Sequence, residues 1–400
     1  MSYSKEKMEI SFEKIKNIKL FINKNNSEYY QTKQKNLLIK ITFFLVLISF
    51  CKFYWEKDIS ITKFGSKKRL KIGIVGVAHG ANVGNNMIKY AISVVLSNLG
   101  FEPYIIGTHP NNFSIKFLNK TTNLIIIRKN FHEVKENDYN ILMVNSDQTW
   151  RKFSKHFLDI GFLRFAQDWH IKKFVYGASL GFDYWSFSPK EVMIMKKLLK
   201  NFTGISVREK GSIKLIQKHL GITPEFVLDP TLLIEKQYYL NLIKDYKNNN
   251  NNYKTNDYIF IYTFGKIKNS EHKINRLYKE LQLKKNEKIY AFNLNNNQTI
   301  EDFIYYISHC KAVVTQSFHG TVFSIIFNKP FLTISVKGWA EERFKSLGKL
   351  LQIENRIVSY KQRPNINLLT TPLNINYNLI EELRIKSINF IKKNLKNYNA

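Results

Sequence analysis

Short apolar runs alternate with longer segments of helical periodicity along most of the chain, and this alternation constrains the fold most. The first run covers 71–77, and an amphipathic segment over 86–99 follows it and ends at Gly100. Such alternation is typical of parallel sheets with helices on both faces, so we predict a doubly wound α/β fold. The predicted strands are 71–77, 103–106, 123–127, 140–144, 174–178, 205–207, 258–263, 288–292, 312–315 and 331–334.

An asparagine-rich tract divides these runs into two groups. The 400 residues are enough for two domains, since a domain commonly takes about 100–200 residues. Residues 247–256 are of low complexity and fit an interdomain linker. We predict Rossmann-like domains over 70–246 and 257–365 that face a cleft, followed by a C-terminal helix within 366–400.

Residues 1–69 form a basic extension with one short apolar segment over 37–55. A membrane span needs about 20 mostly apolar residues. This segment reaches that length only if Lys40 and Lys52 extend their charged ends toward the interfaces. A membrane span, an interfacial anchor and a buried helix all stay open for it. No cleavage site of the signal-peptide type follows it.

The charge balance is strongly basic, with 62 Lys and Arg against 31 Asp and Glu, a net charge of +31. Such a charge attracts nucleic acid, an anionic membrane surface or a phosphorylated substrate. Most of it is lysine scattered along the chain, whereas arginine, the better reader of phosphates and bases, is sparse. Because no nucleic-acid-binding module is present either, we expect no nucleic-acid partner.

The cysteine and metal-ligand patterns exclude further classes of site. The two cysteines, Cys51 and Cys310, lack CxxC spacing and form no disulfide framework, which favours a reducing, cytoplasmic setting. HExxH, Walker A and Cys/His clusters are absent from the sequence. We therefore expect neither a metal nor a cofactor.

The turn after the run 312–315 is the strongest candidate site. It carries Ser317, His319, Gly320 and Thr321, and a helix-like apolar segment follows. Open α/β sheets bind ligands where a strand feeds a helix, and the N–H groups of the new helix attract anions. His319 is placed to bind an anion or to transfer a proton. The alternative is a histidine whose hydrogen bonds are satisfied within an ordinary loop.

A second polar turn, with Asn82, Gly84 and Asn85, follows the strand 71–77. Its glycine permits close approach of a ligand, and its asparagines can cap the next helix. Because the spacing is not GxGxxG, a dinucleotide fingerprint is not supported. A ligand-binding loop and a simple capped turn explain the segment equally well.

Two further strand ends carry polar residues that we expect in the cleft. Asp147, Gln148 and Trp150 follow the strand 140–144, and a carboxylate beside an indole suits sugar binding or base chemistry. An aspartate that caps the next helix is the alternative. Arg208 follows the strand 205–207, and its planar guanidinium suits a carboxylate or phosphate. An ion pair with a neighbouring acid is the alternative for Arg208.

In this order and spacing, the segments resemble the polysaccharide pyruvyl transferase family over about residues 71–358. Each segment alone is a weak signal, whereas the ordered set is specific. Val83 stands where the family usually has an aromatic residue. The matching segments are Asn82-Val83-Gly84-Asn85 with Tyr90-Ala91, Ser146-Asp147-Gln148 with Trp150, Tyr176-Gly177-Ala178-Ser179, Ser206-Val207-Arg208-Glu209, Val227-Leu228-Asp229-Pro230-Thr231 and Ser317-Phe318-His319-Gly320.

The resemblance implies a GT-B-like fold and transfer of the pyruvyl group of phosphoenolpyruvate to two hydroxyls of one sugar, as a cyclic ketal. Phosphoenolpyruvate is then a co-substrate, and the acceptor is a glycan or lipid-linked saccharide of the cell surface. Because the donor is a cytosolic metabolite, we expect the enzyme at the inner face of the cell membrane, where its basic surface suits an anionic leaflet.

The resemblance also implies roles for the residues of the four turns. Arg208 and His319 match positions that contact the donor, and we expect His319 to act as acid or base as well. Asp147 is the candidate for orienting or deprotonating the acceptor hydroxyl. The remaining expected donor contacts are Ser317, Gly320 and Thr321, and the expected acceptor or cleft residues are Asn82, Gly84, Asn85, Gln148 and Trp150.

Two other functions compete with this one. A nucleotide-sugar glycosyltransferase has the same two-domain architecture, because a fold does not fix the chemistry. A non-catalytic basic protein would bind a membrane or nucleic acid through charge alone and show a steep salt dependence.

Overall fold

The computed structural model describes residues 69–396, apart from 77–81, 109–111, 128–130, 153–155, 247–255, 264–274, 276–278, 280–285, 293–297, 336–340 and 360–361. Most of the expected extension over 1–69, with its apolar segment 37–55, lies outside the described residues. So does most of the expected linker over 247–256. Within the described part, no helix combines the length and the apolar character that a membrane crossing requires.

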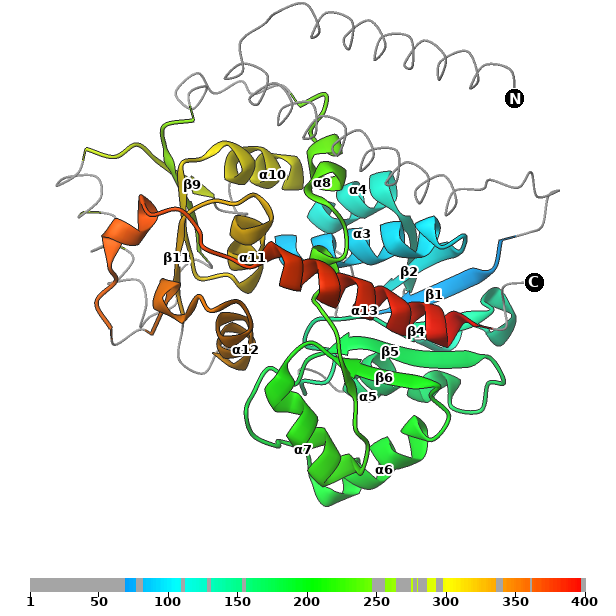
Figure 1. The fold of residues 1–400 in the computed structure, drawn as a ribbon. Coiled ribbons are helices and arrows are strands. Elements are labelled where there is room, and N and C mark those ends of the chain that lie inside the picture. Colours follow the sequence, from blue (N-terminus) through cyan, green and yellow to red (C-terminus); the bar gives the residue numbers. More distant parts are fainter. Residues whose placement is uncertain are drawn as a thin grey trace, which may run out of the picture. The chain divides into compact units, whose positions relative to one another are not determined.

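The first sheet has seven parallel strands in the order β3-β2-β1-β4-β5-β6-β7. Figure 1 labels β2, β1, β4, β5 and β6 of this sheet. Its strand order reverses between β1 and β4, and helices cover both faces, as predicted for a doubly wound sheet. The strands are β1 (Lys71–Val75), β2 (Glu102–Thr108), β3 (Asn123–Ile127), β4 (Ile141–Val144), β5 (Lys172–Ala178), β6 (Gly204–Val207) and β7 (Glu225–Phe226). The helices are α3 (Val83–Asn98), α4 (Asn112–Thr121), α5 (Phe157–Phe162), α6 (Pro189–Leu199) and α7 (Lys210–Leu220).

Successive side chains of a central strand enter two different cores. On β4, Met143 packs into the core that contains the apolar face of α3. Leu142 and Val144 point to the opposite face, into the core beneath α5, α6 and α7. A strand buried on both faces has a continuous apolar sequence rather than an alternating one, which is why the run 140–144 predicted a buried strand.

The second sheet has five parallel strands in the order β12-β11-β10-β8-β9, and its order reverses between β8 and β10. Two-residue strands such as β7 and β12 are too short for sequence periodicity to predict. The strands are β8 (Ile259–Tyr262), β9 (Ile289–Phe292), β10 (Ala312–Thr315), β11 (Phe331–Ile334) and β12 (Ile357–Val358). The helices are α10 (Ile300–His309), α11 (Phe318–Ile326) and α12 (Glu341–Leu351), and the connection between the sheets carries the short helices η4 (Pro230–Leu232) and α8 (Lys236–Asn241).

Local signals explain where several helices begin and end. Ser188 and Glu191 form a reciprocal capping box at the start of α6, and Thr299 and Asp302 form another at the start of α10. Helix α7 ends at Gly221, whose φ of 74° places it in the left-handed region that glycine adopts without strain.

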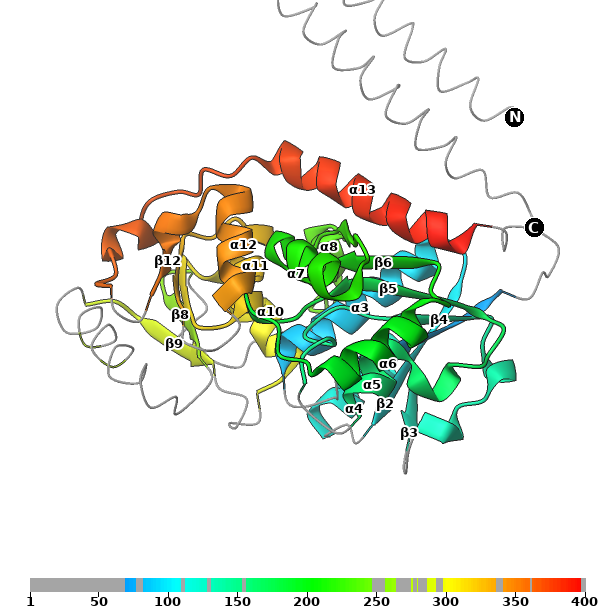
Figure 2. The same ribbon diagram turned by 90° about the horizontal axis from the view of Figure 1, so that it is seen from below.

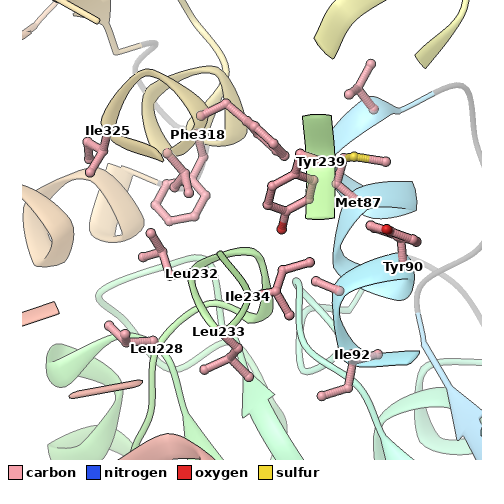
Figure 3. Close-up of a cluster of buried hydrophobic side chains, with 14 of the residues drawn as sticks. Met87, Tyr90, Ile92, Leu228, Leu232, Leu233, Ile234, Tyr239, Phe318 and Ile325 are labelled. Carbon is pink, nitrogen blue, oxygen red and sulfur yellow. The ribbon is translucent and has the colours of Figure 1, made fainter. Parts of the chain in front are cut away.

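Apolar side chains join the two sheets across their boundary (Figure 3). The ring of Tyr239 on α8 lies 6.1 Å from that of Tyr90 on α3 and 4.9 Å from that of Phe323 on α11. Leu232 and Phe318 belong to the same buried cluster. Burial of these side chains stabilises the contact between the two sheets, because each fully buried large apolar side chain contributes about 1.5–3 kcal/mol to stability.

The predicted C-terminal helix, α13 (Tyr377–Leu395), runs from the second sheet back to the first (Figures 1 and 2). At its start, the Tyr377 hydroxyl donates to the Ile325 carbonyl of α11 at 3.1 Å. Near its end, Asn394 accepts a hydrogen bond from the Thr203 hydroxyl, just before β6, at 2.9 Å. Helix α13 therefore connects the two sheets a second time.

Candidate active site

The two sheets face each other at the points where their strand orders reverse. Helix α3 begins after β1, Asp147 follows β4, and α11 begins after β10. Ligands of open parallel sheets bind at such points. Gly84 on α3 and His319 on α11 are in direct contact, which places the two points together.

Arg208, directly after β6, is the centre of a buried ion network. Its side chain is only 1% exposed. Nη2 donates to Oδ1 of Asp147 at 2.8 Å, and Nε donates to Oε1 of Glu209 at 3.3 Å. Nη1 donates to Asp229, which follows β7. The ion pair considered as an alternative from the sequence is therefore what Arg208 makes here, with three acids.

Arg343, in the first turn of α12, brings a second guanidinium to the same place. Its Nη1 lies 3.5 Å from Oδ1 of Asp147. The guanidinium carbons of Arg208 and Arg343 lie 5.2 and 5.1 Å from the ring centroid of Phe318, within the range of cation–π attraction. Among the described residues, Nε of Arg343 has no hydrogen-bond partner. Arg343 thus retains an N–H donor for a ligand.

The network shifts the pKa values of its members. Burial alone would raise the pKa of Asp147, but Arg208 and Arg343 lower it well below its ordinary range. Burial also raises the pKa of Asp229, but Arg208 and His319 lower it below its ordinary range. Burial and repulsion from Arg208 lower the pKa of Arg343 to about 10, against the attraction of Asp147. At neutral pH both aspartates are charged and both arginines are protonated.

His319 is the contribution of β10 and α11 to the network. Its side chain is 5% exposed, and its Nε2 lies 3.6 Å from Oδ2 of Asp229. Nε2 has no hydrogen-bond partner within the described part of the chain. A Cβ added to Gly84 would lie 1.9 Å from Nδ1 of His319, so this contact requires glycine. The imidazole is held between a backbone and a carboxylate.

Asp147 has an unusual backbone conformation. Its φ is 81°, in a region where a residue other than glycine costs about 1–3 kcal/mol. A β-bridge to Ala178 fixes the backbone, and Oδ2 accepts a hydrogen bond from Nδ2 of Asn85 at 3.1 Å. The strained conformation aims the carboxylate at the arginines, as strain at functional sites commonly does.

Trp150 requires a correction, because its side chain does not line the site. The ring is fully buried, stacks on Phe162 at a centroid distance of 4.9 Å, and donates its Nε1 hydrogen to the Gly161 carbonyl at 2.8 Å. Gln148 is also buried and accepts a hydrogen bond from Arg151 at 2.8 Å. Burial of a large aromatic ring in the core stabilises the fold strongly, and the prediction from the sequence did not take this into account.

Asn82 and its neighbours begin α3. Oδ1 of Asn82 accepts a hydrogen bond from the Asn85 N–H at 3.2 Å, which is the cap considered from the sequence. Asn86 donates to the Ser114 hydroxyl at 2.9 Å and ties α3 to α4. Val83, where the family usually has an aromatic residue, is fully buried in the core.

The polar residues around His319 hold α11 against its own sheet. The Ser317 N–H donates to Oγ1 of Thr315 at 3.0 Å, and the Thr321 and Thr333 hydroxyls lie 2.6 Å apart. A Cβ on Gly320 would lie 2.2 Å from Oγ1 of Thr315. Ser317 and Thr321 are both buried.

A small pocket, with a volume of about 20 Å³, lies beside the two arginines. Its polar wall is formed by Arg208, Asp229 and Arg343, with the ring of Phe318 beside them. His319 is not part of this wall. The other lining residues are Phe226, Leu228, Leu232, Ser346, Leu347 and Leu350.

The family model of polysaccharide pyruvyl transferases matches residues 82–338, which is more than half of the chain. The chain belongs to this family. The predicted family is thereby confirmed, and so is the prediction that the protein is a transferase. The match contains the turns of Asn85, Asp147, Arg208 and His319, whereas Arg343 lies beyond it. A search of curated proteins finds no match.

Solved structures resemble this pyruvyl transferase family member in fold, and the first one below, with a TM-score above 0.5, confirms the predicted GT-B-like fold. A Listeria monocytogenes protein described as a UDP-N-acetylglucosamine 2-epimerase has a TM-score of 0.51 at 10% identity, over 83% of this chain and 98% of that one. UDP-GlcNAc 2-epimerase from Neisseria meningitidis, bound to UDP-GlcNAc, has a TM-score of 0.47 at 10% identity, over 81% and 99%. At such identity, the likeness concerns the fold alone.

Four charged members of the transferase's network were not among the residues predicted from the sequence. Glu209 and Asp229 lie in segments that carried the family resemblance, and an acid close to an arginine at a strand end was the available signal. Arg343 opens a predicted helix in a chain poor in arginine. Lys89 is buried on α3, within the mostly apolar run 87–96.

Proposed function

We propose that this transferase moves the pyruvyl group of phosphoenolpyruvate onto two hydroxyls of a sugar. The observation that carries the proposal is the pair of guanidinium groups, Arg208 and Arg343, beside a pocket where the two sheets meet. The donor carries a carboxylate and a phosphate, and guanidinium forks bind both. We assign the direct anion contact to Arg343, because Nε of Arg343 is available, and the supporting charge to Arg208.

The proposed reaction uses the enol carbons of the donor. A proton is added to C3, and the first sugar hydroxyl forms a bond to C2 and gives up its proton. The second hydroxyl then forms a bond to C2, while the C2–O bond to phosphate breaks. The products are a cyclic ketal with a new methyl group and inorganic phosphate, which carries away the second hydroxyl proton. The steps require one group that both gives and takes protons.

We assign that proton transfer to His319. Histidine is suited to both directions at neutral pH, and such catalysis contributes about 10²–10⁴-fold. Asp229, 3.6 Å from Nε2, is placed to hold the imidazolium form. Asp147 fits a positioning role better than that of a base, because a carboxylate with so low a pKa is a weak base. Its role is to hold Arg208 and Arg343.

The acceptor that we propose is a glycan or a lipid-linked saccharide at the inner face of the cell membrane. The net charge of +31 supports it, since an anionic leaflet attracts a basic surface. The donor is also a cytosolic metabolite, and its transfer takes place where it is made.

The test is to incubate the purified chain with phosphoenolpyruvate and a panel of glycans. We expect phosphate release together with an acid-labile pyruvate ketal on the glycan. His319→Asn should reduce phosphate release by about 10²-fold or more, whereas His309→Asn, at a half-buried histidine of α10, should leave it unchanged. Nucleotide release from a sugar nucleotide, without consumption of phosphoenolpyruvate, would indicate a glycosyltransferase instead. A protein that only binds anionic vesicles or nucleic acid would release no phosphate, and His319→Asn would leave its binding unchanged.

A further inference from the structure

Lys89 is a buried lysine that the proposed reaction leaves without a role. It lies in the middle of α3, where the residue is only 2% exposed. Its Nζ donates to Oδ1 of Asn85, one helical turn earlier, and Nδ2 of Asn85 donates to Asp147. An amide thus stands between the lysine and that carboxylate. Burial lowers the pKa of Lys89 to about 7, although Asp147 acts in the opposite direction.

The charges around Lys89 decide what an anion does to it. Elements that pack against α3 bring Asp229, before η4, and His319, on α11, to its neighbourhood, and Asp147 is linked to Lys89 through Asn85. Arg208 lies between the two aspartates. Helix α4 and strand β2 also carry charged or titratable side chains, but these are exposed or half-buried: Lys116, Lys120, Glu102 and Tyr104.

The first-sheet half of this network is rich in acids. Three carboxylates surround Arg208, and the pKa of Glu209 is raised by burial, with Arg208 acting against it. A donor with a carboxylate and a phosphate would add further negative charge beside Asp147. An added anion favours the protonated form of every basic group nearby. The change in protonation is largest for a buried amine that is neutral before the anion binds.

We propose that Lys89 takes up a proton from solvent when the anionic donor binds beside Arg343, so that donor binding and the charge of Lys89 are coupled. The step adds one proton to the Nζ amine to form an ammonium and breaks no covalent bond. Lys89 is a positioning residue: its N–H donors fix the orientation of the Asn85 amide, and Asn85 holds Asp147 against the arginines. The inference rests on the proposed donor.

Calorimetry of phosphoenolpyruvate binding tests this coupling. Titrations at pH 8 in two buffers of different ionisation enthalpy give the number of protons taken up. The phosphate itself contributes little, because its second pKa is near 6. We expect the wild type to take up about half a proton to one proton more than Lys89→Met. Lys89→Gln, which keeps an N–H donor but cannot be charged, should lose the uptake as well.

Lys116→Met, at an exposed lysine of the neighbouring helix α4, is the matched control and should behave as the wild type. Equal uptake by the wild type and both Lys89 variants, with donor binding retained, would overturn the role of Lys89 and leave the proposed function intact. Absence of donor binding by the wild type would instead count against the proposed function.

Thermal unfolding as a function of pH tests the lysine without any ligand. A lysine whose folded pKa lies below its unfolded value of 10.5 makes the folded state less stable below pH 7, and this cost disappears as the pH rises toward 10.5. The Tm of Lys89→Met relative to the wild type should therefore be highest near pH 6 and fall as the pH rises through 7 to 10. A difference in Tm that is independent of pH would show that Lys89 is charged throughout, and the proposal would fail.

Discussion

The two sheets contribute unequal halves of the ion network. Arg208 and the carboxylates Asp147, Glu209 and Asp229 follow strands of the first sheet, whereas Phe318, His319 and Arg343 come from helices that accompany the second sheet. The first half carries more acids than arginines and would repel an anion. The second half brings only basic and aromatic groups. The proposed anionic donor is therefore attracted mainly by the basic groups of the second half, against the acids of the first.

The seam between the halves is narrow and largely apolar. Gly84 touches His319 directly, and Tyr239 packs between Tyr90 and Phe323. Such packing fixes the distance between the arginines and the histidine more tightly than a solvent-filled cleft would. The following changes separate the roles of the first half, the seam and the second half.

The largest effect is expected in the first half, from Arg208→Met. The change removes the cation that three buried carboxylates share, and the expected loss of unfolding free energy is about 3–5 kcal/mol. Urea denaturation measures it. Arg164→Met, at an arginine that is 46% exposed and paired with Asp159, should cost less than about 1 kcal/mol. Equal losses for the two variants would mean that Arg208 is not the centre of the network.

At the seam, Gly84→Ala should reduce kcat/KM by about 10²-fold. The added Cβ would lie 1.9 Å from Nδ1 of His319, so either the imidazole or α3 must move, and misplacement by about 1 Å has this cost. Phosphate release at varied phosphoenolpyruvate concentration measures it. Gly76→Ala, where the nearest contact of the added Cβ is an ordinary 3.7 Å, is the control. Full activity of Gly84→Ala would contradict the contact.

In the second half, Arg343→Met should weaken phosphoenolpyruvate binding at least about tenfold, since a hydrogen bond to a charged group contributes about 1.5–3 kcal/mol. Calorimetric titration gives the Kd. Lys345→Met, on the same helix with an exposed ion pair to Asp183, should bind the donor as the wild type does. An unchanged Kd for Arg343→Met would move the donor contact to the first half.

The smallest effect is expected at the start of α3. Asn82→Ala removes the cap of that helix and should lower the unfolding free energy by about 1 kcal/mol, whereas Asn82→Gly should cost only a few tenths of that amount. Thermal denaturation distinguishes the two. Similar losses for both variants would argue that Asn82 does more than cap α3.

Sequence reasoning predicted the fold better than it predicted side-chain directions. The apolar runs located the central strands, because strands buried on both faces have continuous apolar sequences. Trp150 was misplaced because a strand end identifies an edge of the sheet but not which way a side chain turns. Arg343 was missed because its partner, Asp147, lies far away in the sequence. Contacts between residues far apart in the sequence leave no local periodicity.

Helix α13 has a consequence for how this protein forms during synthesis. The ring of Phe390 lies 6.4 Å from that of Phe174 and 6.2 Å from that of Tyr176, so residues near the end of the chain cover strand β5 of the first sheet. A ribosome delivers the chain from its N-terminus, and domains generally fold in that order. The first sheet must therefore keep an apolar face uncovered until the strands of the second sheet have been made. An apolar face exposed for that long favours aggregation of the nascent chain or its capture by a chaperone.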